Sequence, residues 1–255
     1  MNSPPGEAPD IDLTDDAILG GRLRLLQPAR GHRAGTDAVL LAAALPVEAR
    51  GVLIDVGAGV GAAGLASALG RPALRIVLLE RDPLPARLAG ENLRRNGLEG
   101  RVVEADLFER GSLAAAGLPR EGADLVITNP PYLVQARARA SPDPLRRAAH
   151  VMEQGIGPWV EAAAALLRPG GLFALIHRAD ALAELLPALA GRLGGVALCA
   201  IHPRAEDAAV RIVLRGVKGS RAPLTIAPPL VLHQPSGEFT PRAARLHQGE
   251  EGLFP

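Results

Sequence analysis

The 255-residue sequence contains few cysteines, lysines and aromatic residues, and each shortage excludes a structural feature or a kind of binding surface. Cys199 is the only cysteine, so an internal disulfide is excluded and a reducing, cytoplasmic location is expected. Its apolar neighbours indicate a small buried side chain. Aromatic residues make up 2% of the chain, which is too few for a platform that stacks many bases. Lys218 is the only lysine, and the near-complete cancellation of charge, at a formal +1, excludes a global field that would attract nucleic acid or a membrane surface.

Long apolar runs are also missing. No apolar run reaches 18 residues without a charged residue or a proline-glycine break, which argues against a membrane span and a membrane partner. Residues 1–12 lack the basic and apolar blocks of a signal peptide and are expected to be a disordered leader. Trp159, His177, His202 and His233 show no ligand spacing, so we interpret them as packing or surface residues and expect no metal.

What the sequence does contain is a regular alternation of strand-like and helical runs from Gly51 onward. Apolar strand-like runs occupy residues 52–56, 75–80, 101–106, 123–128 and 171–177. Two further runs, GVALCAIHP and AAVRIVLRGVKG, are joined by a loop too short for a crossover helix, so they should pair antiparallel at the sheet edge. The sequence therefore predicts an α/β fold, a doubly wound, mostly parallel, seven-stranded sheet.

Segments on either side of this core are expected to belong to the same domain, which spans residues 13–255. Residues 13–50 predict a short hairpin or edge strand around a Gly-Gly pair and then a helix, with Thr36 or Asp37 as its N-cap. Residues 51–218 form the core, and residues 219–255 form a proline-rich arm, expected to be extended, packed on the domain.

A glycine-rich turn follows the first core strand. Asp55, Gly57, Gly59 and Gly61 form a D-x-G-x-G-x-G pattern, and glycines at such a turn let a ligand approach the backbone closely. The Lys-Ser/Thr pair of a phosphate-binding P-loop is absent. The Asp55 carboxylate would repel a pyrophosphate but could hold an amine.

The next two strands also end in carboxylates. Glu80 stands where an acid can accept both hydroxyls of an adenosine ribose, and Asp106 follows Glu104 where a carboxylate can accept from an adenine amino group. Such a site fits adenosine that carries a cation, which describes S-adenosylmethionine. NAD is the competing ligand, but its usual G-x-G-x-x-G spacing is replaced here by G-x-G-x-G.

The sequence TNPPY, residues 128–132, ends the fourth core strand. Two prolines fix the backbone and remove N–H donors, which leaves the Asn129 side-chain oxygen and the Pro130 carbonyl as rigid acceptors for a planar NH2 group. An amine held in this way can point its lone pair at an incoming methyl carbon. Tyr132, the only tyrosine, can stack on the flat group that carries the amine.

Taken in order, these motifs resemble those of class I S-adenosylmethionine-dependent methyltransferases of the amino-methylating branch, which have a Rossmann-like fold. The segments QPARGHRAGTDAVLLAAAL, SPDPLRRAAHVMEQGIGPWVEAAAALLRPGG and HQPSGEFTPRAARLHQG resemble the bacterial valine-tRNA adenine-N6 methyltransferase family. The resemblance implies methylation of an adenine N6 amine in tRNA. It also implies that Thr36 and Asp37 close over the methionine end of the cofactor. The remaining cofactor-binding residues that we assign are Arg33, Arg81, Leu107 and Asn129.

An arginine-rich stretch between Leu133 and Gly155 lies beside the expected amine pocket. Its arginines, together with Pro131, are candidates for binding tRNA, although a solvated loop is the alternative interpretation. The candidate phosphate-binding residues are Arg137, Arg139, Arg146 and Arg147.

Other acceptors remain open: a protein glutamine amide modified at N5, a guanine N2 in rRNA, or a small-molecule amine. Release-factor glutamine enzymes typically carry a helical domain before the glycine loop, and here only about 50 residues precede it. A cofactor-binding RNA chaperone or assembly factor is the non-enzymatic alternative. The protein is expected to be a monomer or a weak homodimer.

Overall fold

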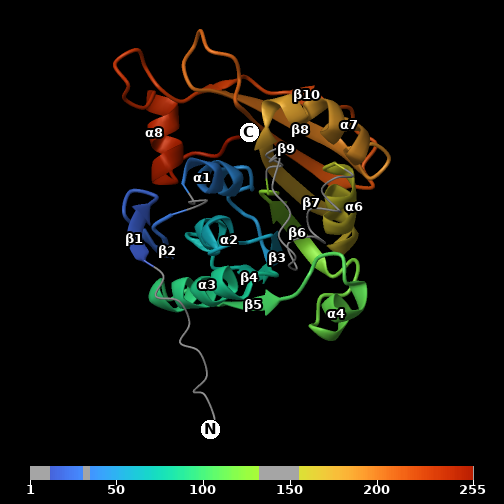
Figure 1. The fold of residues 1–255 in the computed structure, drawn as a ribbon. Helices are drawn as coiled ribbons and strands as arrows, with labels where there is room; N and C mark the ends of the chain where they lie inside the picture. Colours follow the sequence, from blue (N-terminus) through green and yellow to red (C-terminus); the bar gives the residue numbers. More distant parts are fainter. Residues whose placement is uncertain (1–11, 31–34, 132–154, 255) are drawn as a thin grey trace, which may run out of the picture.

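The computed structural model describes residues 12–30, 35–131 and 155–254. Within them, residues 51–218 fold as strands and helices around a central sheet (Figure 1). The strands are β3 (Gly51–Val56), β4 (Leu74–Glu80), β5 (Gly100–Glu104), β6 (Ala123–Thr128), β7 (Leu167–Arg178), β8 (Leu193–His202) and β9 (Arg211–Lys218). The helices are α2 (Ala62–Ala68), α3 (Pro83–Arg95), α4 (Arg110–Ala115), α6 (Gly157–Leu166) and α7 (Leu182–Leu189), the last preceded by a 3₁₀ turn, Ala179–Ala181.

The strand order of the sheet is β10-β8-β9-β7-β6-β3-β4-β5. Among its described strands only β9 runs antiparallel to its neighbours, so the predicted doubly wound sheet with an antiparallel pair is confirmed. The two-residue strands β10 (Thr225–Ile226) and β11 (Leu230–Val231) both pair with β8, which extends the seven predicted strands to nine. The order reverses between β3 and β6, and the carboxyl ends of strands open a crevice at such a point.

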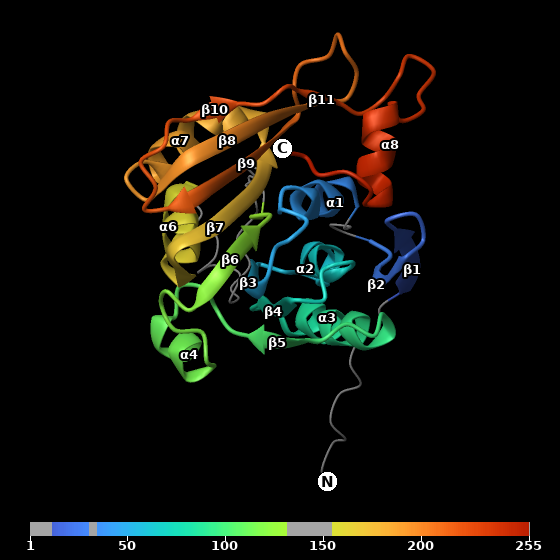
Figure 2. The same cartoon turned by 180° about the vertical axis from the view of Figure 1, so that it is seen from behind.

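Helices cover both faces of the sheet (Figures 1 and 2). Helices α1 (Thr36–Ala43), α2, α3 and α8 (Pro241–Gln248) pack on one face, and α4, α6 and α7 pack on the other. Successive residues of a strand point to opposite faces, and both Leu53 and Ile54 are at most 1% exposed. Burial on both sides explains why these strands are continuous apolar runs rather than alternating ones.

The expected N-terminal hairpin is present as β1 (Leu13–Ile18) and β2 (Leu23–Pro28), which pair antiparallel. Asn92, a fully buried residue of α3, holds it to the domain. The Asn92 side chain accepts from the Leu26 N–H at 2.7 Å and donates to the carbonyls of Leu26 and Val60, both at 3.0 Å. One amide therefore joins the hairpin to the glycine-rich turn.

Replacing Asn92 with Ala is expected to lower the free energy of unfolding by about 2–3 kcal/mol, because buried backbone groups lose their partners. Urea denaturation measures the change. Asn96→Ala is the matched control, because Asn96 also bonds the hairpin, through Arg24, but its bonds to Arg24 are exposed to solvent. Equal losses in the two variants would contradict the argument from burial.

Three local predictions need correction. The N-cap of α1 is Gly35, and neither Thr36 nor Asp37 caps the helix, because both lie inside its first turn. Strand β5 ends at Glu104, so Asp106 lies in the following loop rather than in the strand. The C-terminal arm is not wholly extended, since it carries helix α8, which Thr240 caps through an Oγ1 that accepts from the Ala243 N–H at 3.3 Å.

The last described residues lie against the N-terminal half of the chain. The Leu253 N–H donates to the Ala43 carbonyl at 2.8 Å, and Leu246, Leu253 and Phe254 are buried in the same core as α1 and α2. The Arg215 guanidinium lies 4.7 Å from the centre of the Phe254 ring. Within the described part of the chain, the helices are too short or too polar to cross a membrane.

Candidate active site

The glycine-rich turn Gly57–Gly61 forms the centre of the carboxyl edge, where β3 ends. The backbone φ is +71° at Gly57, +56° at Gly59 and +87° at Gly61, values that side chains disfavour. The N–H groups of Gly57 and Ala58 both donate to the Leu79 carbonyl, at 2.9 and 3.0 Å, which folds the turn toward β4. A Cβ added at Gly59 would meet no described atom within 4 Å, so a ligand has room to approach this backbone.

Glu80, the predicted ribose ligand, lies beside the turn at the end of β4. Its Oε2 accepts from the Gly59 N–H at 2.8 Å, and its Oε1 accepts from the N–H groups of Arg81 and Asp82, both at 2.9 Å. A carboxylate has about four acceptor positions, and these bonds use three. Glu80 therefore fixes the glycine turn and keeps capacity for one hydroxyl donor on Oε2.

Asp55, predicted to hold an amine, is 2% exposed, and its Oδ2 accepts from the Gly64 N–H of α2 at 2.8 Å. Burial raises the pKa of Asp55 to about 7, the Gly64 hydrogen bond opposes this rise, and the charge of Glu80 adds to it. The observed contact joins the end of β3 to α2. Direct contact with a ligand amine stays a prediction.

The loop after β5 brings Asp106 to the same edge. Asp106 Oδ1 accepts from the Phe108 N–H at 2.9 Å, and Arg81 Nη1 lies 4.0 Å from Asp106 Oδ2. Leu107 is 5% exposed, so its side chain belongs to the core beneath the loop. Arg81 and Asp106 thus face each other across the ends of β4 and β5, and the register pairs Glu80 with Glu104 just before them.

The Asn129–Pro130–Pro131 turn follows β6, the strand next to β3. Asn129 is half-buried, Pro130 is buried and Pro131 is exposed. Thr128 lies opposite Val56 in the parallel pair and donates its hydroxyl to the Val56 carbonyl at 2.8 Å. Val56 and Thr128 are thus paired directly, and each is the last residue before its turn. The glycine turn and the predicted acceptor-binding turn therefore begin side by side.

The N-terminal residues assigned to the cofactor make contacts of their own. Thr36 Oγ1 lies 3.3 Å from His247 Nε2 of α8, and Asp37 Oδ2 accepts from Arg211 Nε at 3.0 Å. These contacts join α1 to the end of the chain and to β9. Several predicted site residues lie outside the described residues: Arg33, Tyr132, Arg137, Arg139, Arg146 and Arg147.

Trp159 is a residue at this edge that the sequence interpretation did not place there. It lies in the first turn of α6, and its Nε1 donates to Thr128 Oγ1 at 2.9 Å. A Cβ on Gly57 would lie 3.0 Å from Cζ2 of its indole. The expectation of a packing residue is confirmed, but the packing partner is the glycine turn. Among the described residues, no cluster of three or more His, Cys, Asp or Glu side chains could hold a metal ion.

Gly57→Ala is expected to weaken cofactor binding by about tenfold or more. The variant incurs left-handed backbone strain of about 1–2 kcal/mol, and its methyl group also presses on the indole. Calorimetric titration with S-adenosylhomocysteine measures the affinity. Gly70→Ala is the control, because Gly70 has a φ of +78° but no described atom within 4 Å of an added Cβ. If both variants bound the cofactor equally well, the close packing of Gly57 against the Trp159 indole would have no role in binding.

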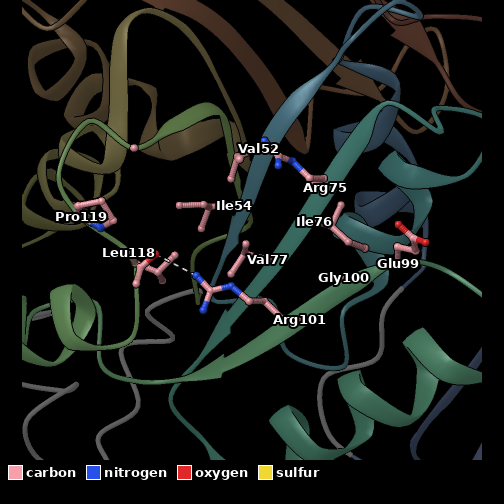
Figure 3. A pocket seen from close by; sticks show the side chains of 12 residues that line it. Val52, Ile54, Arg75, Ile76, Val77, Glu99, Gly100, Arg101, Leu118 and Pro119 are labelled. Atoms are coloured by element: carbon pink, nitrogen blue, oxygen red, sulfur yellow. Dashed lines mark hydrogen bonds between the residues drawn. The ribbon is translucent and has the colours of Figure 1, made fainter.

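One cavity of the described residues lies away from this edge. It has a volume of about 570 Å³ and lies at the opposite end of the strands, with Val52, Ile54 and Val77 among its lining residues (Figure 3). Arg101 lies on one side and donates to the carbonyls of Ala116 and Gly117 at 2.7 and 2.9 Å. We place the active site at the carboxyl edge, because the glycine turn and the convergent polar groups lie there.

Comparison with known proteins identifies the family. The model of the methyltransferase small domain matches residues 33–201. The chain belongs to this family. A curated relative, the tRNA1(Val) (adenine(37)-N6)-methyltransferase of Aeromonas hydrophila subsp. hydrophila, is 30% identical over 217 residues, which are 84% of this chain and 88% of that enzyme. The 4-amino-L-phenylalanine/4-methylamino-L-phenylalanine methyltransferase of Streptomyces pristinaespiralis is 30% identical over 64% of this chain, which spans 55% of that enzyme.

Solved structures agree with this membership. A predicted O-methyltransferase from Agrobacterium tumefaciens superposes with a TM-score of 0.72 at 33% identity, over 86% of this chain and 99% of that one. A 16S rRNA N2 methyltransferase of T. thermophilus, solved with AdoMet and guanosine, superposes with a TM-score of 0.58 at 25% identity, over 84% of this chain and 52% of that one. The protein is an S-adenosylmethionine-dependent N-methyltransferase, and the prediction of this cofactor rather than NAD is confirmed.

Proposed function

We propose that this methyltransferase transfers a methyl group to the exocyclic N6 amine of an adenine in tRNA. The observation that carries the proposal is the Asn129–Pro130–Pro131 turn, which leaves β6 beside the glycine turn and precedes Tyr132 in the sequence. The Aeromonas relative, a tRNA adenine-N6 methyltransferase by name, matches 84% of the chain and supports the choice of acceptor.

The turn presents acceptors to a planar amine. Asn129 Oδ1 and the Pro130 carbonyl accept the two amine hydrogens, so the nitrogen lone pair is directed out of the plane. When bound, S-adenosylmethionine would supply an electrophilic methyl group on a sulfonium, whose carbon–sulfur bond breaks as the methyl carbon bonds to the nitrogen, with S-adenosylhomocysteine as the leaving group. The two fixed carbonyl dipoles stabilise the positive charge that develops on nitrogen, and one N–H proton then passes to solvent. Tyr132 stacks on the base that carries the amine.

The carboxyl edge supplies the remaining contacts for the cofactor. Gly57 and Gly59 admit it to the backbone, Glu80 accepts from the ribose, and Asp106 accepts from the adenine amino group. Asp55 holds the methionine amine, and Thr36 closes over the same end. Arg33, Arg81 and Leu107 complete the proposed cofactor site.

The arginines of residues 133–155 are proposed to bind tRNA phosphates. Their number makes the affinity for RNA depend on salt, since each neutralised phosphate releases counterions. Recognition rests on RNA shape and backbone, with one base taken into the site.

Incubation with methyl-labelled cofactor and bulk unmodified tRNA, followed by nucleoside analysis, tests the proposal. Label in N6-methyladenosine is the expected result. Parallel incubations contain rRNA, purified release factors and 4-aminophenylalanine. Label in N2-methylguanosine, in N5-methylglutamine or in the amino acid, with none in tRNA adenine, would replace the proposed acceptor by the one labelled.

A further inference from the structure

We propose that Trp159 is a positioning residue that couples cofactor binding at the glycine turn to the orientation of the acceptor amine at Asn129. The inference rests on the acceptor site proposed above. Trp159 is the only tryptophan of the chain and lies at the amino end of α6. This helix packs on the face of the sheet opposite to α3, the helix that holds the hairpin.

The first contact is with the glycine turn. The indole atoms Cζ2 and Cη2 lie 3.0 and 3.1 Å from the position that a Cβ would take on Gly57. The indole therefore lies directly against the backbone that receives the cofactor. A displacement of Gly57 on ligand binding must move the ring or be resisted by it, because the packing leaves no gap between them.

The second contact is a pair of hydrogen bonds in series. Trp159 Nε1 donates to Thr128 Oγ1 at 2.9 Å, and this hydroxyl donates to the Val56 carbonyl at 2.8 Å. Thr128 and Val56 are both fully buried. Val56 immediately precedes Gly57, and Thr128 immediately precedes Asn129. The two bonds thus join α6 to both strand ends at the last residue before each functional turn.

The third contact reaches the loop on the adenine side. The rings of Trp159 and Phe108 meet edge to face, with centroids 6.1 Å apart and an interplanar angle of 71°. Phe108 also donates its N–H to Asp106. One indole therefore touches the loops after β3 and β5 and bonds to the end of β6.

This arrangement has a kinetic consequence. Transfer requires the amine lone pair and the methyl carbon to be aligned, and a small misplacement costs rate steeply. Because the indole fixes the distance between the two turns, its loss changes the alignment even when both turns keep their own residues. We expect a lower kcat together with a weaker cofactor affinity.

The test compares Trp159→Phe, Thr128→Val and the double variant. Trp159→Phe keeps a ring but loses the donor, and Thr128→Val loses the acceptor. Each single variant is expected to lower kcat about tenfold. The double variant should lose much less than the product of the single losses, because both changes break the same hydrogen bond. Kinetics with labelled cofactor give kcat and KM, and calorimetry with S-adenosylhomocysteine gives the binding constant.

Val160→Ala is the matched control. Val160 is a fully buried neighbour in α6, so its truncation removes packing from the same helix while it keeps Trp159 and the hydrogen bond to Thr128. It should lower the melting temperature and leave kcat and KM at their native values. If Val160→Ala shifted kcat as much as Trp159→Phe, or if the losses of the two single variants multiplied fully, the coupling would be refuted.

Fluorescence gives a readout that does not depend on the acceptor. With a single tryptophan, the emission of the native protein reports on this indole alone, and S-adenosylhomocysteine should change its intensity or wavelength. Unchanged emission at saturation would overturn the inference, whichever substrate is methylated. If emission responds and binding weakens in Trp159→Phe while tRNA adenine stays unlabelled, the acceptor assignment fails and the coupling to the glycine turn stands.

Discussion

Asn129→Ala is expected to abolish almost all methyl transfer while changing cofactor affinity by no more than a few-fold. The variant loses the side-chain acceptor that we propose orients the amine, and removal of one such preorganised group from an active site costs about 10²–10³ in kcat. Cofactor affinity is largely kept, because the glycine turn and its partner Glu80 are untouched. Single-turnover assays with labelled cofactor give the rate, and S-adenosylhomocysteine titration gives the affinity.

Asn96→Ala provides the same substitution at a remote position. Asn96 terminates α3 and bonds the hairpin through Arg24, so it should cost some stability and no turnover. Native turnover in Asn129→Ala would refute the role of Asn129 in holding the acceptor. Comparable losses in both variants would point to general destabilisation instead.

Asp55→Asn is expected to make the protein less sensitive to alkaline pH. In the native protein the pKa of Asp55 is raised from 3.8 to about 7, chiefly by burial. Between these values the folded protein binds a proton that the unfolded chain has released, so stability is full at low pH and falls as the pH rises through 7. From pH 5 to pH 8 the free energy of unfolding should drop by about 2–3 kcal/mol through this group.

The Asn side chain keeps an oxygen for the Gly64 N–H but carries no charge, so its variant should lack this decline. Urea denaturation of both proteins at pH 5 and pH 8 measures the difference. The native protein should be less stable than the variant at pH 8, and the difference should shrink at pH 5. Parallel pH profiles for the two proteins would mean that Asp55 ionises normally.

Asp124→Asn is the control, because the pKa of Asp124 is shifted in the opposite direction from that of Asp55. Burial alone would raise the pKa of Asp124, but the Val52 N–H and the Arg168 guanidinium outweigh it and hold the pKa below its ordinary value. Its contribution is therefore present above pH 4 and lost only in stronger acid. Asp124→Asn should lower stability equally at pH 5 and pH 8, because both conditions lie above its titration.

Much of the sheet was predictable because its strands are buried on both faces. The range 123–128 agrees with β6 at both ends, and the loop between β8 and β9 was short enough to require antiparallel pairing. Helix α8 had local signals, with Thr240 before Pro241 and Gly249 after its last turn, but these lay within a proline-rich segment. Thr36 and Asp37 were misassigned as caps because the N-cap of α1 is Gly35, a residue with no side chain that could bond the helix.

The grouping of the candidate site residues at one edge was predictable where those residues lie within short motifs. The glycine turn, Glu80 and the Asn129 turn are each local patterns, and the parallel topology brings them to one edge. Trp159 could not be placed in this way, because its contacts with Gly57 and Thr128 depend on how α6 packs after the sheet has formed. The bonds of Glu80 to three backbone N–H groups were equally invisible, since they depend on the conformation of two loops.

The burial of Leu246, Leu253 and Phe254 beside α1 has a consequence for biosynthesis. A ribosome delivers α1 and α2 long before these residues are made, so the face of the nascent chain that they cover stays exposed to solvent until the segment up to Phe254 has been synthesised. Strand β9 adds to the delay, because it is inserted between β7 and β8 after both have been made. The nascent polypeptide therefore completes this core only when the segment up to Phe254 has left the ribosome, and until then its apolar surface is available to chaperones.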